Sequence, residues 1–314
     1  MDVVNAKNGV TYISSRKLGV PNAFFTKCGG TSKKYGLNLG FKPEDGLEVY
    51  GKNMKLAAEA AGFDETKLIS WAQTHSNKIL SIKASDGGLE YIKNAEFPDG
   101  CFADGYVTDV PGVVLGVKTA DCVPVLLSAK RNGRMLAVGA VHAGWRGTAG
   151  RICENAVNAL CELGAKPNEI FVAIGPSAMQ CCYEVGQDVF SAMREAIGDR
   201  ADRYFSEGRE GKYFVDLKGI NASILHECGV PYENMDISEL CTICEPRYFY
   251  SHRRDGNDRG THLNVILCAI EPPSRLCPAI TEMRNFGFAF LLFINCEYMP
   301  LLPIIFRLPK RTLR

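Results

Sequence analysis

Three short apolar runs stand close together in the middle of the chain, and they constrain the fold more than any other feature. They are Val113–Val117, Val123–Leu127 and Met135–Val141. Apolar runs of this length, bounded by polar residues or glycine, are typical of buried strands. A segment with apolar residues at helical spacing, Ile152–Leu163, comes next, and Gly164 stands where helices commonly end. This alternation predicts an α/β fold.

Other segments extend the same pattern. We expect helices over Met54–Ala61, Val185–Ile197 and Leu217–Cys228, a strand over Ile170–Ile174, and an exposed loop over Asp199–Lys212. Asp216 precedes the last of these helices and is a suitable N-cap. At 314 residues with 46% hydrophobic content, the chain is long enough for a large core in one or two domains.

Domain organisation follows from where the motifs lie. Residues 1–269 hold all of them, so we expect one domain there and an atypical hydrophobic extension over 270–314. Within the extension, Phe286–Phe306 is almost wholly apolar but is interrupted by Asn295, Glu297 and two prolines. Its length would suit a membrane span. The interruptions disfavour membrane contact through 286–306, and we expect an appended segment instead.

Charge and cysteine usage exclude some partners and compartments. The net charge is +1, which gives no clustered basic excess for binding nucleic acid. The first ten residues lack the basic and apolar regions of a secretory signal, so we expect a cytoplasmic protein. The 13 cysteines are an odd number spread along the chain, which favours reduced thiols over a disulfide framework.

Three short segments place reactive groups beside apolar ones: Gln73–Ser76, Thr119–Cys122 and His142–Gly147. His75, Cys122 and His142 are of the residue types that bind zinc, and three protein ligands leave a fourth position open, as catalysis requires. Taken singly, each has a plainer interpretation, as a loop histidine or a buried thiol. Asp121 could orient a ligand histidine, or it could be an ordinary hydrogen-bond acceptor at a strand end.

The glycine-containing turn after His142 has a chemistry of its own. Arg146, Gly147 and Thr148 precede a helix expected to begin near Ala149. Free amides at a helix start favour an anion, and an arginine adds a fork for phosphate or carboxylate. An ordinary helix start with a surface arginine is the alternative.

Two further groups and one histidine are less specific. The polar segment 246–256 contains Arg247, His252, Arg253, Arg254 and Asp255, which could form a site or a solvated loop. Cys241 and Cys244 have C-x-x-C spacing, but no second pair with zinc-finger spacing exists, which disfavours a structural zinc site. A redox role for the pair stays open. His226, inside a predicted helix, is interpreted as structural.

Taken in order, these segments resemble the laccase-domain family, also called YfiH-like or DUF152, over about Phe24–Ala269. The matching stretches are Phe25–Gly30, Leu37–Gly40, Gln73–Ser76, Thr119–Cys122, His142–Gly147, Ile174–Pro176, Cys241–Thr242 and Tyr250–Gly256. Each is weak alone, but the ordered set is specific.

The resemblance implies an α/β fold of the α+β type, with mixed sheets sandwiched by helices, similar to a bacterial toxin's cysteine-deamidase domain. It implies zinc held by His75, Cys122 and His142. It also implies phosphorolysis of adenosine, inosine, guanosine and methylthioadenosine, with adenosine deamination as a second activity. The implied partners are therefore a nucleoside and phosphate, with Arg146 and Lys27 holding the phosphate. Copper, which the family's polyphenol-oxidase name suggests, is less favoured because this chain has only five histidines.

Two departures from the family pattern stand out. Lys27 replaces the usual arginine, which keeps the charge but loses the planar fork. The family pattern ends soon after Leu263–Cys268, so the segment from Glu271 is an addition.

Two rival functions remain open at this stage. In the first, Cys122 is the nucleophile of a metal-free hydrolase, with His142 or His75 as its base, editing peptidoglycan precursors. In the second, the domain is a non-catalytic binding module.

Overall fold

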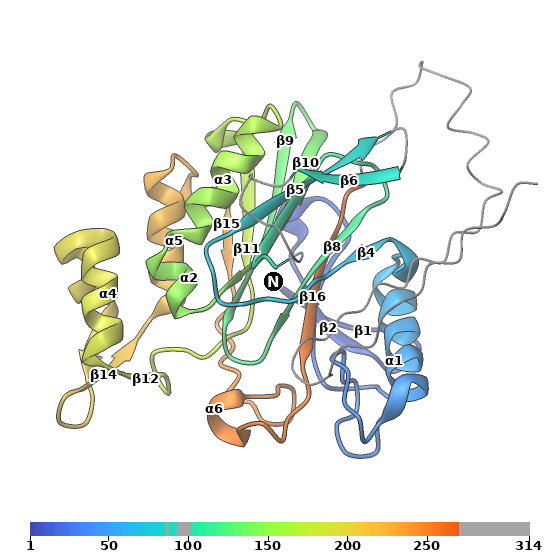
Figure 1. Cartoon of the computed structure of the whole chain (residues 1–314), viewed down its shortest axis with the longest axis horizontal. Coiled ribbons are helices and arrows are strands. Elements are labelled where there is room, and N and C mark those ends of the chain that lie inside the picture. Colours follow the sequence, from blue (N-terminus) through green and yellow to red (C-terminus); the bar gives the residue numbers. More distant parts are fainter. Residues whose placement is uncertain (86–87, 93–101, 270–314) are drawn as a thin grey trace, which may run out of the picture.

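The computed structural model describes residues 1–85, 88–92 and 102–269, which form a mixed α/β architecture (Figure 1). The expected fold class is confirmed. One sheet has six strands in the order β1 (Asp2–Asn5), β2 (Thr11–Ser14), β3 (Asn22–Phe25), β16 (His262–Leu267), β8 (Val114–Thr119) and β4 (Leu68–Ile69). The second has seven, in the order β15 (Met235–Ile237), β11 (Ile170–Ile174), β9 (Val123–Arg131), β10 (Arg134–Ala143), β7 (Gly105–Thr108), β5 (Ile79–Ser85) and β6 (Gly88–Ile92).

The remaining elements cover or extend these two sheets. A small third sheet joins β12 (Glu184–Gly186), β14 (Lys212–Val215) and β13 (Phe205–Glu207). The helices are α1 (Gly46–Ala61), α2 (Trp145–Ala149), α3 (Ile152–Glu162), α4 (Gln187–Ile197), α5 (Leu217–Glu227) and α6 (His252–Asp255).

The two large sheets pack face to face between helices. Their shared core contains Leu115 and Ile266 from the six-stranded sheet and Leu126 and Val138 from the seven-stranded sheet. On the outer face of the seven-stranded sheet, α3, α4 and α5 bury a second cluster, and α1 covers the other sheet. Figure 1 shows α1 on the opposite side of the sheets from α3 and α5. Mixed sheets are therefore sandwiched by helices.

Burial on both faces explains why the central strands are apolar without alternation. Along β9, Val123, Val125 and Leu127 face the helices, whereas Leu126 faces the other sheet. Because successive side chains of a strand point to opposite faces, a strand covered on both sides needs apolar residues throughout. The three apolar runs of the sequence are therefore β8, β9 and β10.

Several helix boundaries follow the local signals. Helix α1 ends at Gly62, which has φ 72°, and the Asp216 side chain accepts a hydrogen bond from Gly219 N at 2.9 Å to cap α5. Helix ends leave backbone groups without a partner inside the helix. A residue with a left-handed backbone after the last turn, or a hydrogen-bond acceptor before the first turn, satisfies some of them. His226 lies in α5 with Nδ1 at 3.2 Å from Val230 O, consistent with a structural role.

Four expectations about elements were wrong in detail. The helix expected over Met54–Ala61 begins earlier, at Gly46. The segment 185–197 begins as a strand, because Val185 lies in β12, and the helix starts at Gln187. The supposed loop 199–212 contains a 3₁₀ helix, Gly198–Tyr204, and β13, whose pairing with β14 the local sequence could not reveal. The helix expected near Ala149 begins at Trp145, so Arg146 lies inside α2.

Four strand ends meet at one edge of the seven-stranded sheet. Strand β9 is antiparallel to β10, with His142 opposite Pro124, and β10 is antiparallel to β7, with Val141 opposite Gly105. Strand β5 is parallel to β7, with Ile79 opposite Gly105. The start of β9, the end of β10 and the starts of β7 and β5 therefore lie together.

Within the described residues, no helix combines the length and apolarity that a membrane crossing requires. The extension 270–314, with its apolar segment 286–306, lies outside the described residues.

Candidate metal centre

His75, Cys122 and His142 converge at the edge where the four strand ends meet. Their ligand atoms all lie within 4.8 Å of one another, and Cys122 Sγ is 3.8 Å from His75 Nε2. The two imidazole rings are 4.9 Å apart and nearly perpendicular. His142 is buried, Cys122 is half-buried and His75 is exposed, so the group is open to solvent on one side. The structure thus brings together all three ligands expected from the sequence.

A fourth residue, Asp104, holds two of these ligands from behind. It is fully buried just before β7, and its Oδ1 lies 2.7 Å from His142 Nδ1. The backbone amides of Thr74, His75 and Ser76 donate to its carboxylate at 3.1, 3.0 and 2.7 Å. His75 has a left-handed backbone, φ 59°. These hydrogen bonds stabilise that unusual conformation and fix the direction of the His75 side chain.

Sequence reasoning missed Asp104, although its type and its place before a strand are those of a residue that orients a metal ligand. Because a carboxylate only accepts hydrogen bonds, Nδ1 of His142 must carry its proton. Nε2 is then free for a metal. No local pattern marked Asp104, since it lies 38 positions before His142.

The charges in the group are coupled. Burial alone would raise the pKa of Asp104, but hydrogen bonds from His142 and Ser76 and the charge of His142 lower it to about 2. Burial would also raise the pKa of the Cys122 thiol, whereas the two histidines lower it below its usual value. Negative charge on Cys122 and Asp104 raises the pKa of His142 against the effect of its burial. The site therefore favours a thiolate.

Gly144 is required by the close approach of the three ligands. A Cβ at this position would lie 2.9 Å from His75 Cδ2, 3.3 Å from Cys122 Sγ and 3.7 Å from His142 Cε1. Its backbone is ordinary, with φ −67°, so space and not conformation demands glycine here. The donor set and this cradle fit a metal such as zinc, which accepts imidazole and thiolate ligands.

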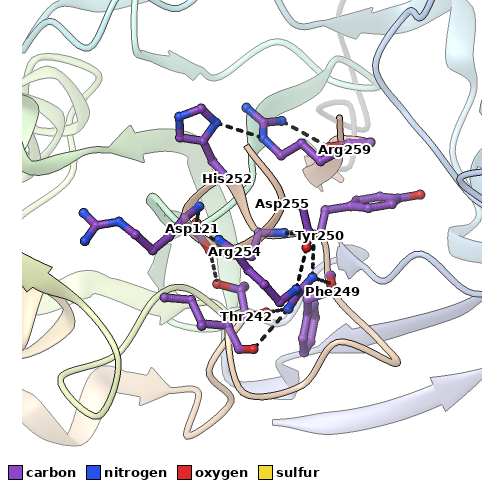
Figure 2. Close-up of polar contacts among 12 residues, drawn as sticks. Asp121, Thr242, Phe249, Tyr250, His252, Arg254, Asp255 and Arg259 are labelled. Atoms are coloured by element: carbon purple, nitrogen blue, oxygen red, sulfur yellow. Dashed lines mark hydrogen bonds and ion pairs between the residues drawn. The ribbon is translucent and has the colours of Figure 1, made fainter. Parts of the chain in front are cut away.

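Asp121 lies beside Cys122 but faces away from the histidines. Its Oδ1 accepts from Thr242 Oγ1 at 2.6 Å, and its Oδ2 accepts from Ser251 Oγ at 2.9 Å and from Arg253 N at 2.6 Å. Figure 2 shows Asp121 among the residues of the 242–259 segment. The carboxylate that orients a ligand histidine is thus Asp104, while Asp121 ties the Cys122 turn to the segment that carries α6.

Tyr183 lies within electrostatic range of two arginines, and it also interacts with Cys122. The Tyr183 phenol interacts electrostatically with four charged groups, those of Cys122, Asp121, Arg253 and Arg146. Its ring lies 5.0 Å from the Arg253 guanidinium, and Arg146 stacks on Trp145 at 4.3 Å. Burial and the negative charge of Cys122 raise the pKa of Tyr183 to about 12, so it stays a neutral phenol. Tyr183 is a second residue that no sequence signal singled out.

The polar segment 246–256 is held in place by hydrogen bonds within the protein and is not only a solvated loop. Arg254 donates to the carbonyl oxygens of Thr242, Ile243 and Phe249 and pairs with Asp255 (Figure 2). His252 is exposed, with Nδ1 3.4 Å from Arg259 Nε.

Lys27 lies elsewhere, in a cavity of about 310 Å³. The lining of this cavity is mainly charged and contains Lys27, Lys34, Arg247, Asp255, Asp258 and Arg259. Neither Arg146 nor the three metal-site ligands line it. Lys27 therefore lines a charged cavity of which Arg146 is not part.

The fold and the site define a protein of two packed mixed sheets with a His/Cys group at one sheet edge that could hold a metal ion. The chain belongs to the family described as multi-copper polyphenol oxidoreductase laccase, which matches residues 21–269.

Curated relatives and solved structures agree with this assignment. A protein named adenosine deaminase RL5, from an unknown prokaryotic organism, is 36% identical over 76% of this chain and 90% of its own length. A purine nucleoside phosphorylase of Deinococcus radiodurans is 35% identical over 82% of this chain and 93% of its own. The crystal structure of YlmD from Geobacillus stearothermophilus matches with a TM-score of 0.73 and 32% identity, over 84% of this chain and 98% of that one. The YfiH structure of Bacillus licheniformis gives the same TM-score, 0.73, at 30% identity over 84% of this chain and 98% of that one.

Proposed function

We propose that this chain is a zinc-dependent purine nucleoside phosphorylase that also deaminates adenosine. Its nucleosides would be adenosine, inosine, guanosine and methylthioadenosine. The observation that carries the proposal is the convergence of His75, Cys122 and His142 around one point, with Asp104 holding the histidines. The names of the relatives, purine nucleoside phosphorylase and adenosine deaminase, supply the two reactions.

Zinc and the residues around it would have separate roles in the two reactions. When bound, zinc supplies Lewis acidity and lowers the pKa of a coordinated water. In phosphorolysis, a phosphate oxygen attacks C1′ of the ribose, the C1′–N9 bond breaks, and the purine leaves with a proton. Arg146, exposed on α2 beside the metal group, would hold the anion. In deamination, water attacks C6 and ammonia leaves.

The departing purine is stabilised by a hydrogen-bond donor beside it. Tyr183 would be that donor, because burial raises its pKa to about 12 and its phenol keeps its proton at neutral pH. Asp104 keeps Nδ1 of His142 protonated, and Asp121 holds the Cys122 turn through Thr242. Lys27, which lines the charged cavity, is the second residue proposed to hold the phosphate.

The test is incubation of purified, metal-assayed protein with adenosine, with and without phosphate, and chromatography of the products. The proposal expects adenine and ribose 1-phosphate only with phosphate, and inosine in both cases. A His142→Ala variant should form neither. Absence of all three products with fully metal-loaded wild-type protein would overturn the proposal.

A metal-free cysteine hydrolase is the second candidate, and one observation favours it. Cys122, His142 and Asp104 form a chain in which the histidine bonds the aspartate at 2.7 Å and lowers the pKa of the thiol. That order of nucleophile, base and orienting carboxylate is the one cysteine hydrolases use. Its substrate would be an amide of a peptidoglycan precursor.

Metal dependence separates the two candidates. Activity that survives removal of zinc by a chelator but is abolished by alkylation of Cys122 would support the hydrolase. Activity that is lost with zinc and restored by stoichiometric zinc supports the phosphorylase and deaminase.

A further inference from the structure

A second group of metal-binding side chains lies apart from the one described above. The turn after β11 carries Cys181 and Cys182, and the segment after β15 carries Cys241 and Cys244. Strands β11 and β15 are parallel neighbours, so the segments that follow them leave the sheet side by side. A bridge between Ser177 and Cys241 continues this pairing beyond the strands.

The four sulfur atoms stand at the spacing of a metal site. All lie within 4.8 Å of one another, with Cys182 Sγ 3.1 Å and Cys181 Sγ 3.5 Å from Cys244 Sγ. Tetrahedral zinc with Zn–S bonds of about 2.3 Å places its sulfurs roughly 3.8 Å apart. A disulfide would bring two sulfurs to about 2.05 Å. The group is therefore too open for a disulfide and has the compactness of a four-thiolate site.

One of the four sulfurs, that of Cys241, has hydrogen-bond donors and a buried ammonium beside it. Backbone amides of Cys244, Met179 and Ile243 bond the Cys241 sulfur. The ammonium of Lys218 is buried beside Cys241, and it donates to Ser238 O at 2.7 Å and Leu240 O at 3.0 Å. A buried ammonium is costly unless negative charge lies near it. A zinc ion with four thiolates carries a net charge of −2, which Lys218 and the amides would partly compensate.

We propose that Cys181, Cys182, Cys241 and Cys244 bind a zinc ion as a structural site separate from the His75–Cys122–His142 group. Each thiol gives up its proton to solvent when it binds, and no oxidant or reductant is required. Four protein ligands leave no open position, so the site is structural and not catalytic. The other two cysteines, Cys181 and Cys182, are adjacent in the sequence. A search for a second C-x-x-C pair therefore does not find them.

The position of this site gives it a role in the fold of the metal centre. Thr242 lies between the two cysteines of the C-x-x-C pair, and its amide donates to Ser177 O at 3.0 Å while its hydroxyl donates to Asp121 at 2.6 Å. Asp121 immediately precedes Cys122. The four-cysteine site would therefore hold the segment that fixes the Cys122 turn, and it would act on the first group through Thr242.

Metal counting on the full-length chain tests the proposal. We would purify it under reducing conditions, remove loosely bound metal by gel filtration, and measure zinc per chain by mass spectrometry. Two metal groups predict two zinc ions in the wild type. The double variant Cys181→Ser/Cys244→Ser should retain one, and so should His142→Ala. Cys161→Ser, a half-buried thiol outside both groups, should retain two.

Cobalt substitution provides a readout that does not depend on the stability of a double variant. Cobalt-loaded His142→Ala should show the intense sulfur-to-cobalt charge transfer of a four-thiolate site. Its melting temperature should fall when a chelator is added.

Three results would overturn the proposal. One is a wild type that binds zinc and a His142→Ala variant that binds none. Another is ready alkylation of all four cysteines in the native reduced chain despite added zinc. The third is a Cys182–Cys244 disulfide that persists through purification under reducing conditions. A failed phosphorylase assay with two zinc ions bound would contradict only the proposed function.

Discussion

His142 and Asp104 are joined by two hydrogen bonds, one between side chains and one between backbones. Nδ1 of His142 lies 2.7 Å from Oδ1 of Asp104, and His142 N donates to Asp104 O at 2.6 Å. The two hydrogen bonds fix the position of His142 relative to Asp104 where β7 and β10 meet. The same carboxylate accepts from the amides around His75, so one buried charge positions both histidines.

Asp104→Asn should weaken zinc binding by about 10- to 100-fold, because loss of an orienting partner has that typical effect. The side chain of asparagine is neutral, so it cannot replace the carboxylate that accepts hydrogen bonds from the backbone amides of Thr74 and Ser76. Competition with a chromophoric chelator measures the affinity. Asp109→Asn, at an exposed position on the same segment, is the matched control and should bind zinc normally. Equal affinity of the two variants would contradict this role of Asp104.

Gly144→Ala should reduce zinc content while the fold is retained. The added methyl group would lie 2.9 Å from His75 and 3.3 Å from Cys122 and would displace both side chains. Zinc per chain and circular dichroism measure the two effects. Gly51→Ala is the control: its Cβ would meet nothing within 4 Å in helix α1. It should keep its zinc and gain about 0.5–1 kcal/mol of stability. Full zinc content in Gly144→Ala would show that the cradle is looser than it appears in the structure.

Lys27→Arg should lower the KM for phosphate on the order of tenfold, if the charged cavity receives the phosphate. An arginine provides the planar fork that lysine lacks, and a charge-assisted hydrogen bond contributes about 1.5 kcal/mol or more. Steady-state kinetics with varied phosphate measure it, and Lys33→Arg, outside the cavity lining, is the control. If Arg146→Gln raises this KM and Lys27→Arg leaves it unchanged, the phosphate binds beside α2.

His262 should make the protein sensitive to mild acid. It is 3% exposed, its Nε2 accepts from Tyr250 N at 2.8 Å, and burial lowers its pKa to about 3. The unfolded chain, with a histidine pKa of about 6.5, takes up the proton first. The free energy of unfolding therefore falls as the pH drops from about 6.5 towards 3, by about 1.4 kcal/mol per pH unit.

Urea unfolding at pH 7.5 and 5.0 checks this behaviour. The wild type should lose about 2 kcal/mol more than His262→Gln over that interval. Parallel losses in the two proteins would show that other groups cause the acid sensitivity.

Removal of residues 270–314 should leave zinc content and activity intact. The family match ends at residue 269, and β16, the last described strand, is complete at Leu267 between β3 and β8. Truncation after Thr261 removes this strand from the middle of the sheet and should abolish folding. Melting curves of the two truncated proteins provide the comparison. An unfolded 1–269 protein would show that the extension is part of the core.

Local sequence predicted the strands β8, β9, β10 and β11 and one part of the site. Apolar runs specify β8, β9 and β10 because strands covered on both faces need apolar side chains throughout. Since β9 and β10 are consecutive and antiparallel, Cys122 before the first and His142 at the end of the second meet through a hairpin alone. The boundary errors at Val185 and 199–212 arose where β12, β13 and β14 pair only with one another.

Tertiary structure decided everything that depends on strands distant in the chain. His75 and Asp104 come together because β5 lies parallel to β7, and Cys181 meets Cys244 because β11 lies parallel to β15. Lys27 and Arg146 both lie in stretches that match the family, but only Lys27 lines the charged cavity. The physical reason is that residue periodicity encodes which face of an element is buried. It does not encode which distant strand that element pairs with, because that is set by the burial and hydrogen bonding of the whole chain.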